Sequence, residues 1–384
     1  MTSIRQIRRM MIGGMAVGMA AALTACASAA PQPLSDSGRT EVRQAVDAAV
    51  AAGTPGVQVV VTERGQDWTA TAGVGNIATA AGFPEDARVR IGSNTKVFVA
   101  TVLMQLVAAG TVELDAPVER YLPGVVRGDG IDGNRITVRN LMQHTSGLPE
   151  YLELPELDGD YEVMRDQRFN PAELVRSALA SGPGHFTPGE KAEYSNTNYL
   201  IVGMLVERVT GHPFAEEVQR RIIEPLGLSA TYVPAAGEID LRDPHPLSYE
   251  VVDGQRAEVT RFDTSWAGAA GAMVSTGREL NRFFTALLSG KLLQPAQLAQ
   301  MQRDPMPLTN RAAGIDYALG LARLSVPCGK QVWGHGGSIP GFRTYAGVTA
   351  DGRAVTVLAN QRPADSASDA ALQHVFDTAV CATS

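Results

Sequence analysis

The sequence predicts an α+β protein in which helices flank an antiparallel β-sheet and a mostly helical second domain lies beside it. Strand-like runs occur near both ends of the chain, at 57–73 and between 331 and 360. Helical segments alternate with loops rich in proline, glycine and aspartate from 111 to 258. We therefore expect one sheet domain, built from 39–110 and 259–384, and a helical domain at 111–258.

The first residues have the pattern of an export signal. Residues 1–25 combine a basic start, an apolar stretch and an exit rich in small residues. Two cleavage sites fit: LTAC resembles a bacterial lipobox that would lipidate Cys26, whereas Ala27-Ser28-Ala29 suits an ordinary signal peptidase. Residues 26–38 then form a linker. We expect a secreted or extracytoplasmic protein, with the lipid anchor favoured and with the membrane contacted only through it.

Net charge argues against one class of partner. The chain carries 33 basic and 40 acidic residues, and loss of the signal removes three arginines but no carboxylate, so the net charge falls to about −10. Nucleic acid attracts basic surfaces, so we expect no nucleic-acid partner. The sequence contains neither an H-E-x-x-H motif nor paired Cys and His spacing. We therefore expect no metal and no cofactor, and we expect a monomer.

Local patterns give the elements in chain order. Residues 40–53 have helical spacing and a terminal glycine, and two strands follow, joined by a turn. The next helix begins near Ser93 and is apolar on almost every side, which predicts burial. Toward the C-terminus, QVWGHGG, FRTYAGV and AVTVLAN are predicted strands. The last two are joined at Asp351-Gly352, and a closing helix starts near Ser366.

Lys96 is one of only four lysines in a chain with 33 basic residues. It follows Ser93 by three residues, so the two side chains share a helix face. Burial in the apolar helix would lower the pKa of Lys96 and let it accept a proton, which arginine cannot do. The helix N-terminus also offers free backbone N–H groups to a developing oxyanion. The pattern predicts a serine activated by a lysine.

Two further motifs strengthen this prediction. EYSNTN places Tyr194 and Asn196 two residues apart just before a helix, and in extended backbone both would face the serine. WGHGGS places His335 and Gly337 in a strand, where glycines allow a ligand backbone to come close. The combination with S-x-x-K is equivalent to the signature of penicillin-binding proteins and one class of β-lactamases.

On these residues the chain resembles the serine β-lactamase and penicillin-binding-protein superfamily. The resemblance is strongest to the secreted serine-type D-alanyl-D-alanine carboxypeptidase, with class C β-lactamases and related esterases further off. It extends over most of the mature chain, through ITVRNLMQHTSGL, YSNTNYLIVGMLVERVTGH, SWAGAAGAMVST and YALGLARLSVPCGKQVWGHGG. It implies an antiparallel sheet flanked by helices, with the active site in the cleft beside a helical domain.

The resemblance also implies roles for residues. Ser93 would be the nucleophile and Lys96 its proton partner, and Tyr194 would be the general base and later the acid. The backbone N–H groups of Ser93 and Ser338 would form the oxyanion hole. Asn196 would hold the acyl side chain of the substrate. The other substrate-binding positions implied are His335, Gly336, Gly337, Ser338 and Trp266, with His335 and Gly337 at a sheet edge where a peptide lies as an added strand.

Two positions depart from the carboxypeptidase pattern. Ala322 replaces an arginine that holds the substrate's terminal carboxylate, and Gly336 replaces the partner threonine. Arg323 and Arg343 remain as alternative sources of the lost charge, although Arg323 should point to the opposite sheet face from position 322. We therefore expect modest cleavage of D-alanyl-D-alanine peptides beside hydrolysis of uncharged esters or D-amino-acid amides.

The leading functional hypothesis is an exported serine D,D-carboxypeptidase that works through an acyl-enzyme and is inhibited by β-lactams. Its substrate would be a peptidoglycan-type peptide or a small ester or amide. An esterase and a class C-like β-lactamase are alternatives of the same fold, and a non-catalytic wall-peptide-binding protein is a remote one. Cys328 and Cys381 follow the export signal, so we expect them to form a disulfide in an oxidising compartment.

Overall fold

The computed structural model describes residues 33–157 and 165–383. The predicted signal and Cys26 lie outside these residues. The first helix, α1 (Asp36–Ala51), begins inside the linker predicted at 26–38, so the last three residues of that linker are helical. The helix starts there because the Ser35 side chain accepts a hydrogen bond from Gly38 N and caps its first turn.

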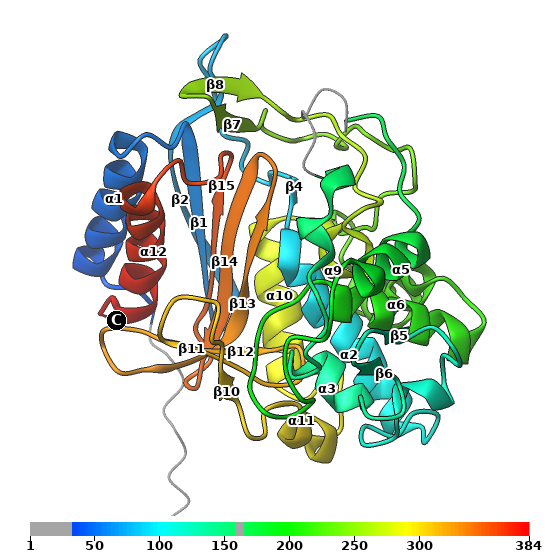
Figure 1. Cartoon of the computed structure of the whole chain (residues 1–384). Helices are drawn as coiled ribbons and strands as arrows, with labels where there is room; N and C mark the ends of the chain where they lie inside the picture. Colours follow the sequence, from blue (N-terminus) through cyan, green and yellow to red (C-terminus); the bar gives the residue numbers. More distant parts are fainter. Residues whose placement is uncertain (1–32, 158–164, 384) are drawn as a thin grey trace, which may run out of the picture.

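A nine-stranded sheet joins the two ends of the chain (Figure 1). β1 pairs with β15 and β2, and all the pairings in the sheet are antiparallel, as predicted. In spatial order its strands are β10 (Met306–Pro307), β11 (Ile315–Tyr317), β12 (Ala322–Ser325), β13 (Gln331–Ile339), β14 (Phe342–Thr349), β15 (Ala354–Ala359), β1 (Gly56–Glu63), β2 (Gln66–Asn76) and β3 (Ala81–Gly82).

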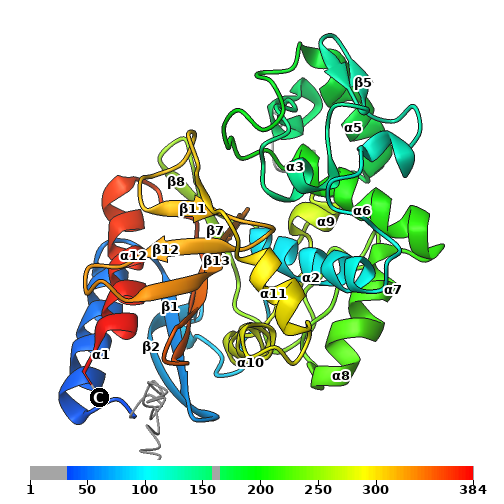
Figure 2. The same ribbon diagram turned by 90° about the horizontal axis from the view of Figure 1, so that it is seen from below.

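Helices cover both faces of this sheet. α1 and α12 (Ser366–Cys381) pack on one face, and α10 (Gly277–Leu288) packs on the other (Figures 1 and 2). Alternate residues of β1 point to opposite faces of the sheet. Val57, Val59 and Val61 pack in the core under α1 and α12, whereas Val60 contacts α10. Burial on both faces explains why valines of this strand point to both sides of the sheet.

The boundaries predicted for the helical domain, at 110 and 258, lie at or just after the ends of α2 (Thr95–Ala108) and β8. The remaining elements lie mostly on the side of the sheet that carries α2. They are β4 (Val89–Arg90), η1 (Gly92–Asn94), η2 (Val118–Arg120), β5 (Arg127–Gly128), β6 (Ile131–Asp132), α3 (Val138–Met142), η3 (Tyr151–Glu153), η4 (Pro155–Leu157), α5 (Pro171–Ser181), α6 (Thr197–Thr210), α7 (Phe214–Val218), η5 (Gln219–Ile223), α8 (Glu224–Leu226), β7 (Tyr249–Val252), β8 (Gln255–Glu258), α9 (Gly268–Gly271), β9 (Val274–Ser275) and α11 (Pro295–Met301). Among the described residues, no helix is both long and apolar enough to cross a membrane.

The C-terminal helix is fastened to the sheet by covalent and ionic contacts. Cys328, between β12 and β13, is bonded to Cys381 at the end of α12, which confirms the predicted disulfide. Nearby, the buried Arg353 lies 2.6 Å from Glu63 and donates to the last carbonyl groups of α12. These partners compensate the guanidinium charge that burial would otherwise penalise.

One half of β13 has an edge that β12 does not cover. The pairing between β12 and β13 ends at Ala322 and Gly334, so 335–339 continue past the end of β12. This half, which β12 leaves unpaired, lies beside η1, and a Cβ atom built on Gly337 would come within 2.0 Å of Ile91 O. The sheet therefore places an unpaired strand edge next to the segment that carries Ser93.

Candidate active site

Ser93 and Lys96 meet at the start of one helix. Ser93 lies in η1, which runs directly into α2. The spacing of three residues places the two side chains together, and Lys96 Nζ lies 2.9 Å from Ser93 Oγ. The pair predicted from the sequence is therefore present, in a helix that is buried almost throughout.

Lys96 is enclosed by oxygen atoms. Besides Ser93, its Nζ lies 2.7 Å from Asn196 Oδ1 and 2.6 Å from the carbonyl oxygen of Ala270. Burial lowers the pKa of Lys96 well below its ordinary value of 10.5, and the nearby Glu150 carboxylate opposes this only in part. A neutral amine has two N–H groups and one lone pair. If the two carbonyl oxygens accept the N–H groups, the lone pair is left for the hydroxyl proton of Ser93.

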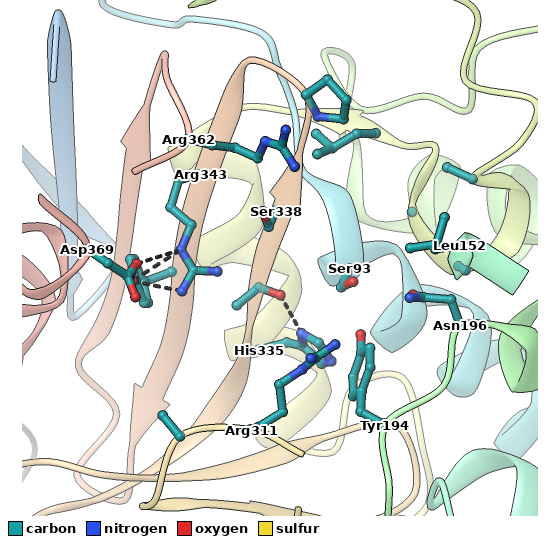
Figure 3. Close-up of a pocket in the computed structure, with 18 of the residues that line it drawn as sticks. Ser93, Leu152, Tyr194, Asn196, Arg311, His335, Ser338, Arg343, Arg362 and Asp369 are labelled. Carbon is teal, nitrogen blue, oxygen red and sulfur yellow. Dashed lines mark hydrogen bonds and ion pairs between the residues drawn. The ribbon is translucent and has the colours of Figure 1, made fainter. Parts of the chain in front are cut away.

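Tyr194 precedes α6 and points its hydroxyl toward Ser93 (Figure 3). The hydroxyl is buried and has no hydrogen-bond partner of regular geometry among the described residues. Burial raises the pKa of Tyr194 above its ordinary value of 10.0, while the Ser93 hydroxyl and the Arg311 guanidinium lower it in part. Tyr194 is therefore a neutral phenol near neutral pH, able to donate a proton to a group bound at Ser93.

Segments that the sequence analysis did not connect hold Tyr194 in place. Its backbone N–H donates to Asn310 Oδ1 at 2.8 Å, and Asn310 Nδ2 donates to its carbonyl oxygen at 3.0 Å. The His144 ring packs against the tyrosine ring, with centroids 4.2 Å apart. The guanidinium carbon of Arg311 lies 4.5 Å from the same ring centroid. No carboxylate pairs with Arg311 in the part of the chain that the structure describes, so this cation acts directly on Tyr194.

Asn196 is the N-cap of α6 and has helical backbone angles, φ −68° and ψ −23°. The extended backbone assumed for 194–196 is therefore wrong at this residue, although both side chains do line the cleft with Ser93. Glu150 fixes the amide: its Oε2 accepts from Asn196 N at 2.8 Å and from Asn196 Nδ2 at 2.9 Å. Asn196 Oδ1 is thereby left facing Lys96.

The third motif lies on the uncovered half of β13. His335 Nε2 is 2.9 Å from the Tyr317 hydroxyl, and burial lowers the pKa of His335 to about 3, so the ring is neutral near pH 7. A Cβ atom built on Gly92 would lie 2.8 Å from Ser338 N, and Gly92 has φ +50°. Glycine at this position lets the backbone of η1 approach Ser338, as an oxyanion hole formed by the N–H groups of Ser93 and Ser338 requires. The role of that pair stays a prediction.

A groove of about 1600 Å³ opens above Ser93 and extends in two directions. Toward the helical side it is lined by apolar groups that include Leu152, Phe262 and Trp266. Trp266 packs on Phe262 with ring centroids 6.5 Å apart and also reaches the groove, so it takes part in both core packing and the lining.

Toward α12 the groove passes over Gly336 and reaches Arg343. Ala322 is buried opposite Gly334 and carries no charge into the groove. Of the two replacement cations considered, Arg323 is paired with Asp316 at 2.5 Å, whereas Arg343 lines the groove.

No group of three His, Cys, Asp or Glu side chains within 33–157 and 165–383 is arranged to hold a metal ion. The side chains and backbone groups at the site include a hydroxyl, an adjacent amine, a neutral phenol and N–H groups beside a strand edge.

Comparison with known proteins gives a consistent result. The family model described as Beta-lactamase matches residues 42–379. A penicillin-binding protein of Bacillus subtilis (strain 168) is 26% identical over 73% of this chain and 62% of its own length. Esterase EstB of Burkholderia gladioli is 36% identical over 44% of this chain and 45% of its own length. The matches to these curated relatives thus span at most about three fifths of their length.

Solved structures match more of the chain. A D-stereospecific amidohydrolase from Streptomyces sp. is 39% identical, with a TM-score of 0.82 over 90% of this chain and 99% of that one. The D-amino acid amidase of Ochrobactrum anthropi SV3, complexed with L-phenylalanine amide, is 28% identical, with a TM-score of 0.80 over 90% and 98% of the two chains. These neighbours confirm the fold expected from the sequence.

Proposed function

Because this chain belongs to the Beta-lactamase family, we propose that it is an exported serine hydrolase that cleaves D-alanyl-D-alanine-type peptides and related D-amino-acid amides. The reaction would pass through an acyl-enzyme on Ser93, and β-lactams would inhibit it by acylating the same oxygen. The monomeric state and the lipid anchor at Cys26 stay predictions.

The contacts of Lys96 support a specific route for the proton. Neutral Lys96 would take the hydroxyl proton of Ser93 while the oxygen attacks the substrate carbonyl, and Tyr194 would protonate the departing nitrogen. The family resemblance instead implies the base role for Tyr194. Burial moves the two pKa values in directions that favour the exchanged roles, because the lysine is deprotonated more easily and the tyrosine less easily. Water would then release the acyl group by the reverse transfers.

The single observation that carries the proposal is the uncovered edge of β13 beside Ser93. β12 leaves the backbone of 335–339 unpaired on this edge, where it can pair with a substrate that itself has a peptide backbone, which an amide-linked substrate offers and a simple ester lacks. The preference for D-residues is supported by the solved neighbours named as a D-stereospecific amidohydrolase and a D-amino acid amidase.

An esterase is the second candidate, and a specific observation favours it. Ala322 and Gly336 stand where the carboxypeptidase pattern has an arginine and a threonine that bind a charged leaving group. A relative that matches 44% of this chain is named an esterase. A leaving alcohol needs neither of these groups.

The test is a matched substrate set: an acyl-D-alanyl-D-alanine peptide, a D-amino-acid amide, the L-isomers of both, and an uncharged ester of the same acyl group. The proposal expects D-amides and D-peptides to be hydrolysed at least about a hundredfold faster than their L-isomers, and expects Ser93→Ala to lose all turnover. Hydrolysis of the ester alone would favour the esterase. Equal rates for D- and L-amides would exclude the D-specific proposal.

A further inference from the structure

Arg90 is a buried arginine close to the nucleophile that the proposed mechanism does not use. It lies in β4, where it pairs with Val274 of β9, and only 1% of it is exposed. The segment η1, which carries Ser93, follows at Gly92. The position of the Arg90 guanidinium is therefore tied to the segment that carries the nucleophile.

The guanidinium binds three backbone carbonyl groups. Nη1 donates to Thr260 O at 2.5 Å, and Nη2 donates to Ile239 O at 2.8 Å and to Phe262 O at 3.1 Å. Several acceptors that meet at one buried point need a group with many N–H donors in fixed directions, which a guanidinium provides and an ammonium does not. Arg90 thereby joins the chain before and after the β7–β8 hairpin to the segment of Ser93.

The same guanidinium contacts the aromatic ring of Phe262. Its central carbon lies 4.0 Å from the ring centroid, which is within the range of a cation–π contact. Arg90 thus holds Phe262 by both its backbone and its ring. Phe262 in turn packs on Trp266, and both aromatic side chains line the groove above Ser93. Arg90 itself is not among the described residues that line the groove.

This aromatic wall lies on the acyl side of the groove. The helical side is lined by Leu152 together with Phe262 and Trp266. Figure 3 shows Leu152 on the same side of Ser93 as Asn196, which the family resemblance places at the acyl side chain of the substrate. An acyl side chain directed toward Asn196 would meet apolar surface there. Burial of apolar surface favours a large acyl side chain over a small one.

We propose that Arg90 is a positioning residue that fixes the wall of Phe262 and Trp266 relative to Ser93, so that the enzyme prefers large apolar acyl side chains. This inference rests on the proposed function and names the acyl group of its substrates. Arg90 acts through Phe262 and touches no reacting atom. Its loss should therefore change the choice between acyl groups and spare the chemical step for a small one.

Two substrates with one leaving group isolate this effect. D-phenylalanine amide and D-alanine amide both release ammonia and differ only in the acyl side chain. The wild-type enzyme should have the higher kcat/KM on D-phenylalanine amide. Arg90→Met keeps the length of the side chain and removes its donors and its charge. It should lower the ratio of the two kcat/KM values by about tenfold or more, with kcat/KM for D-alanine amide within about threefold of wild type.

Arg353→Met is the matched control. Arg353 is equally buried and also donates to backbone carbonyl groups, those of Ala379, Val380 and Ala382, but it does so at the end of α12. This variant should lose thermal stability and keep the substrate ratio of the wild type. A merely structural role for Arg90 would give the same result in both arginine variants, namely lower stability with an unchanged ratio.

Phe262→Leu keeps the test decisive where Arg90→Met does not fold. It retains Arg90 and removes the ring that the guanidinium contacts, so the substrate ratio should fall to a similar extent. In the double variant the two losses should not add, because side chains that act as one unit are coupled. Additive losses, or an unchanged ratio in Phe262→Leu, would show that Arg90 does not act through this ring.

The two proposals fail in different ways. Hydrolysis of neither amide by the wild-type enzyme would overturn the proposed function. The acyl preference is then measured on p-nitrophenyl acetate and p-nitrophenyl 3-phenylpropanoate, which again share a leaving group. In either series, a wild-type preference for the smaller acyl group, or a ratio that is unchanged in Arg90→Met, would overturn the role of Arg90. Turnover of no substrate in either series would overturn both proposals.

Discussion

The two ends of the groove are built in contrasting ways. Around Ser93 the polar side chains are buried and face one another: Lys96 is fully enclosed, and Asn196 uses its amide for Glu150 and Lys96. Toward α12 the charged groups are partly exposed, with 22% of the Arg343 side chain and 48% of the Asp369 side chain accessible. In the first region burial shifts the pKa values of Lys96 and Tyr194. In the second region Nη1 of Arg343 makes only a long contact, 3.5 Å, with the carbonyl oxygen of Gly337.

This contrast separates chemistry from specificity. Burial lowers the pKa of Lys96 and raises the pKa of Tyr194, and both effects require that water be kept from these side chains. A leaving-group site must instead admit and release charged molecules, which needs exposure. Changes at the buried end should therefore reduce turnover of every substrate, whereas changes at the exposed end should alter only the preference among substrates.

The largest effect is expected from Lys96→Arg. This change keeps a positive charge but removes the group that accepts the serine proton, so kcat/KM should fall by roughly three or more orders of magnitude. Lys291→Arg, the same substitution at an exposed position, is the control and should have no effect. Steady-state kinetics on a D-amino-acid amide would measure both. Near wild-type activity in Lys96→Arg would contradict the proton-transfer role.

A large pH dependence should follow from the same lysine. Lys96 accepts a proton only when it is deprotonated, so kcat/KM should fall about tenfold per pH unit as the pH drops below its lowered pKa. Because the pKa of His335 is about 3, the histidine should not produce this decrease between pH 5 and 8. A full profile on the wild type and on His335→Gln would check the assignment. A shift of the acid limb by the histidine substitution would assign that limb to His335.

A smaller effect is expected from Arg311→Gln. Loss of the cation over the Tyr194 ring should raise the pKa of that tyrosine further and make it a poorer proton donor to the leaving group. We expect kcat for a neutral amide to fall by about tenfold with KM nearly unchanged. Arg323→Gln, which removes an arginine paired with Asp316, is the matched control. Equal losses in the two variants would indicate a general structural effect.

The smallest effect on activity should come from the disulfide, because neither cysteine lines the groove that contains Ser93. Replacing Cys328 and Cys381 by serine opens a loop with a sequence separation of 53 and should lower the free energy of unfolding by about 4 kcal/mol in the chain-entropy model. Chemical denaturation would measure the loss, and kcat/KM at 25 °C should stay within about twofold. A large loss of activity in protein that remains folded would show that α12 controls the catalytic centre.

Local patterns were enough to predict much of the fold. The closing helix begins at Ser366 as expected, and the three C-terminal strands and the two N-terminal strands occur where the patterns place them. Ser93 and Lys96 were predictable because a spacing of three residues on a helix determines their proximity. The start of α1 was missed because Ser35 caps the helix inside a segment whose composition resembles a linker.

The support of Tyr194 was not predictable from local pattern. Asn310 contacts Tyr194 across a sequence separation of 116, and Arg311 lies in an exposed loop without periodicity. The choice between Arg323 and Arg343 also needed the structure, because both arginines have a carboxylate partner and only Arg343 reaches over Gly336 and lines the groove. Such contacts follow from tertiary packing and leave no local signal.

The acyl-enzyme itself provides the most direct test of the central claim. The protein would be incubated with penicillin, and its intact mass and peptide map would be measured before and after. The account predicts one added equivalent, located on Ser93 and absent from Ser93→Ala. An adduct on Ser146 or Ser338, or turnover of D-amino-acid amides that persists in Ser93→Ala, would contradict it.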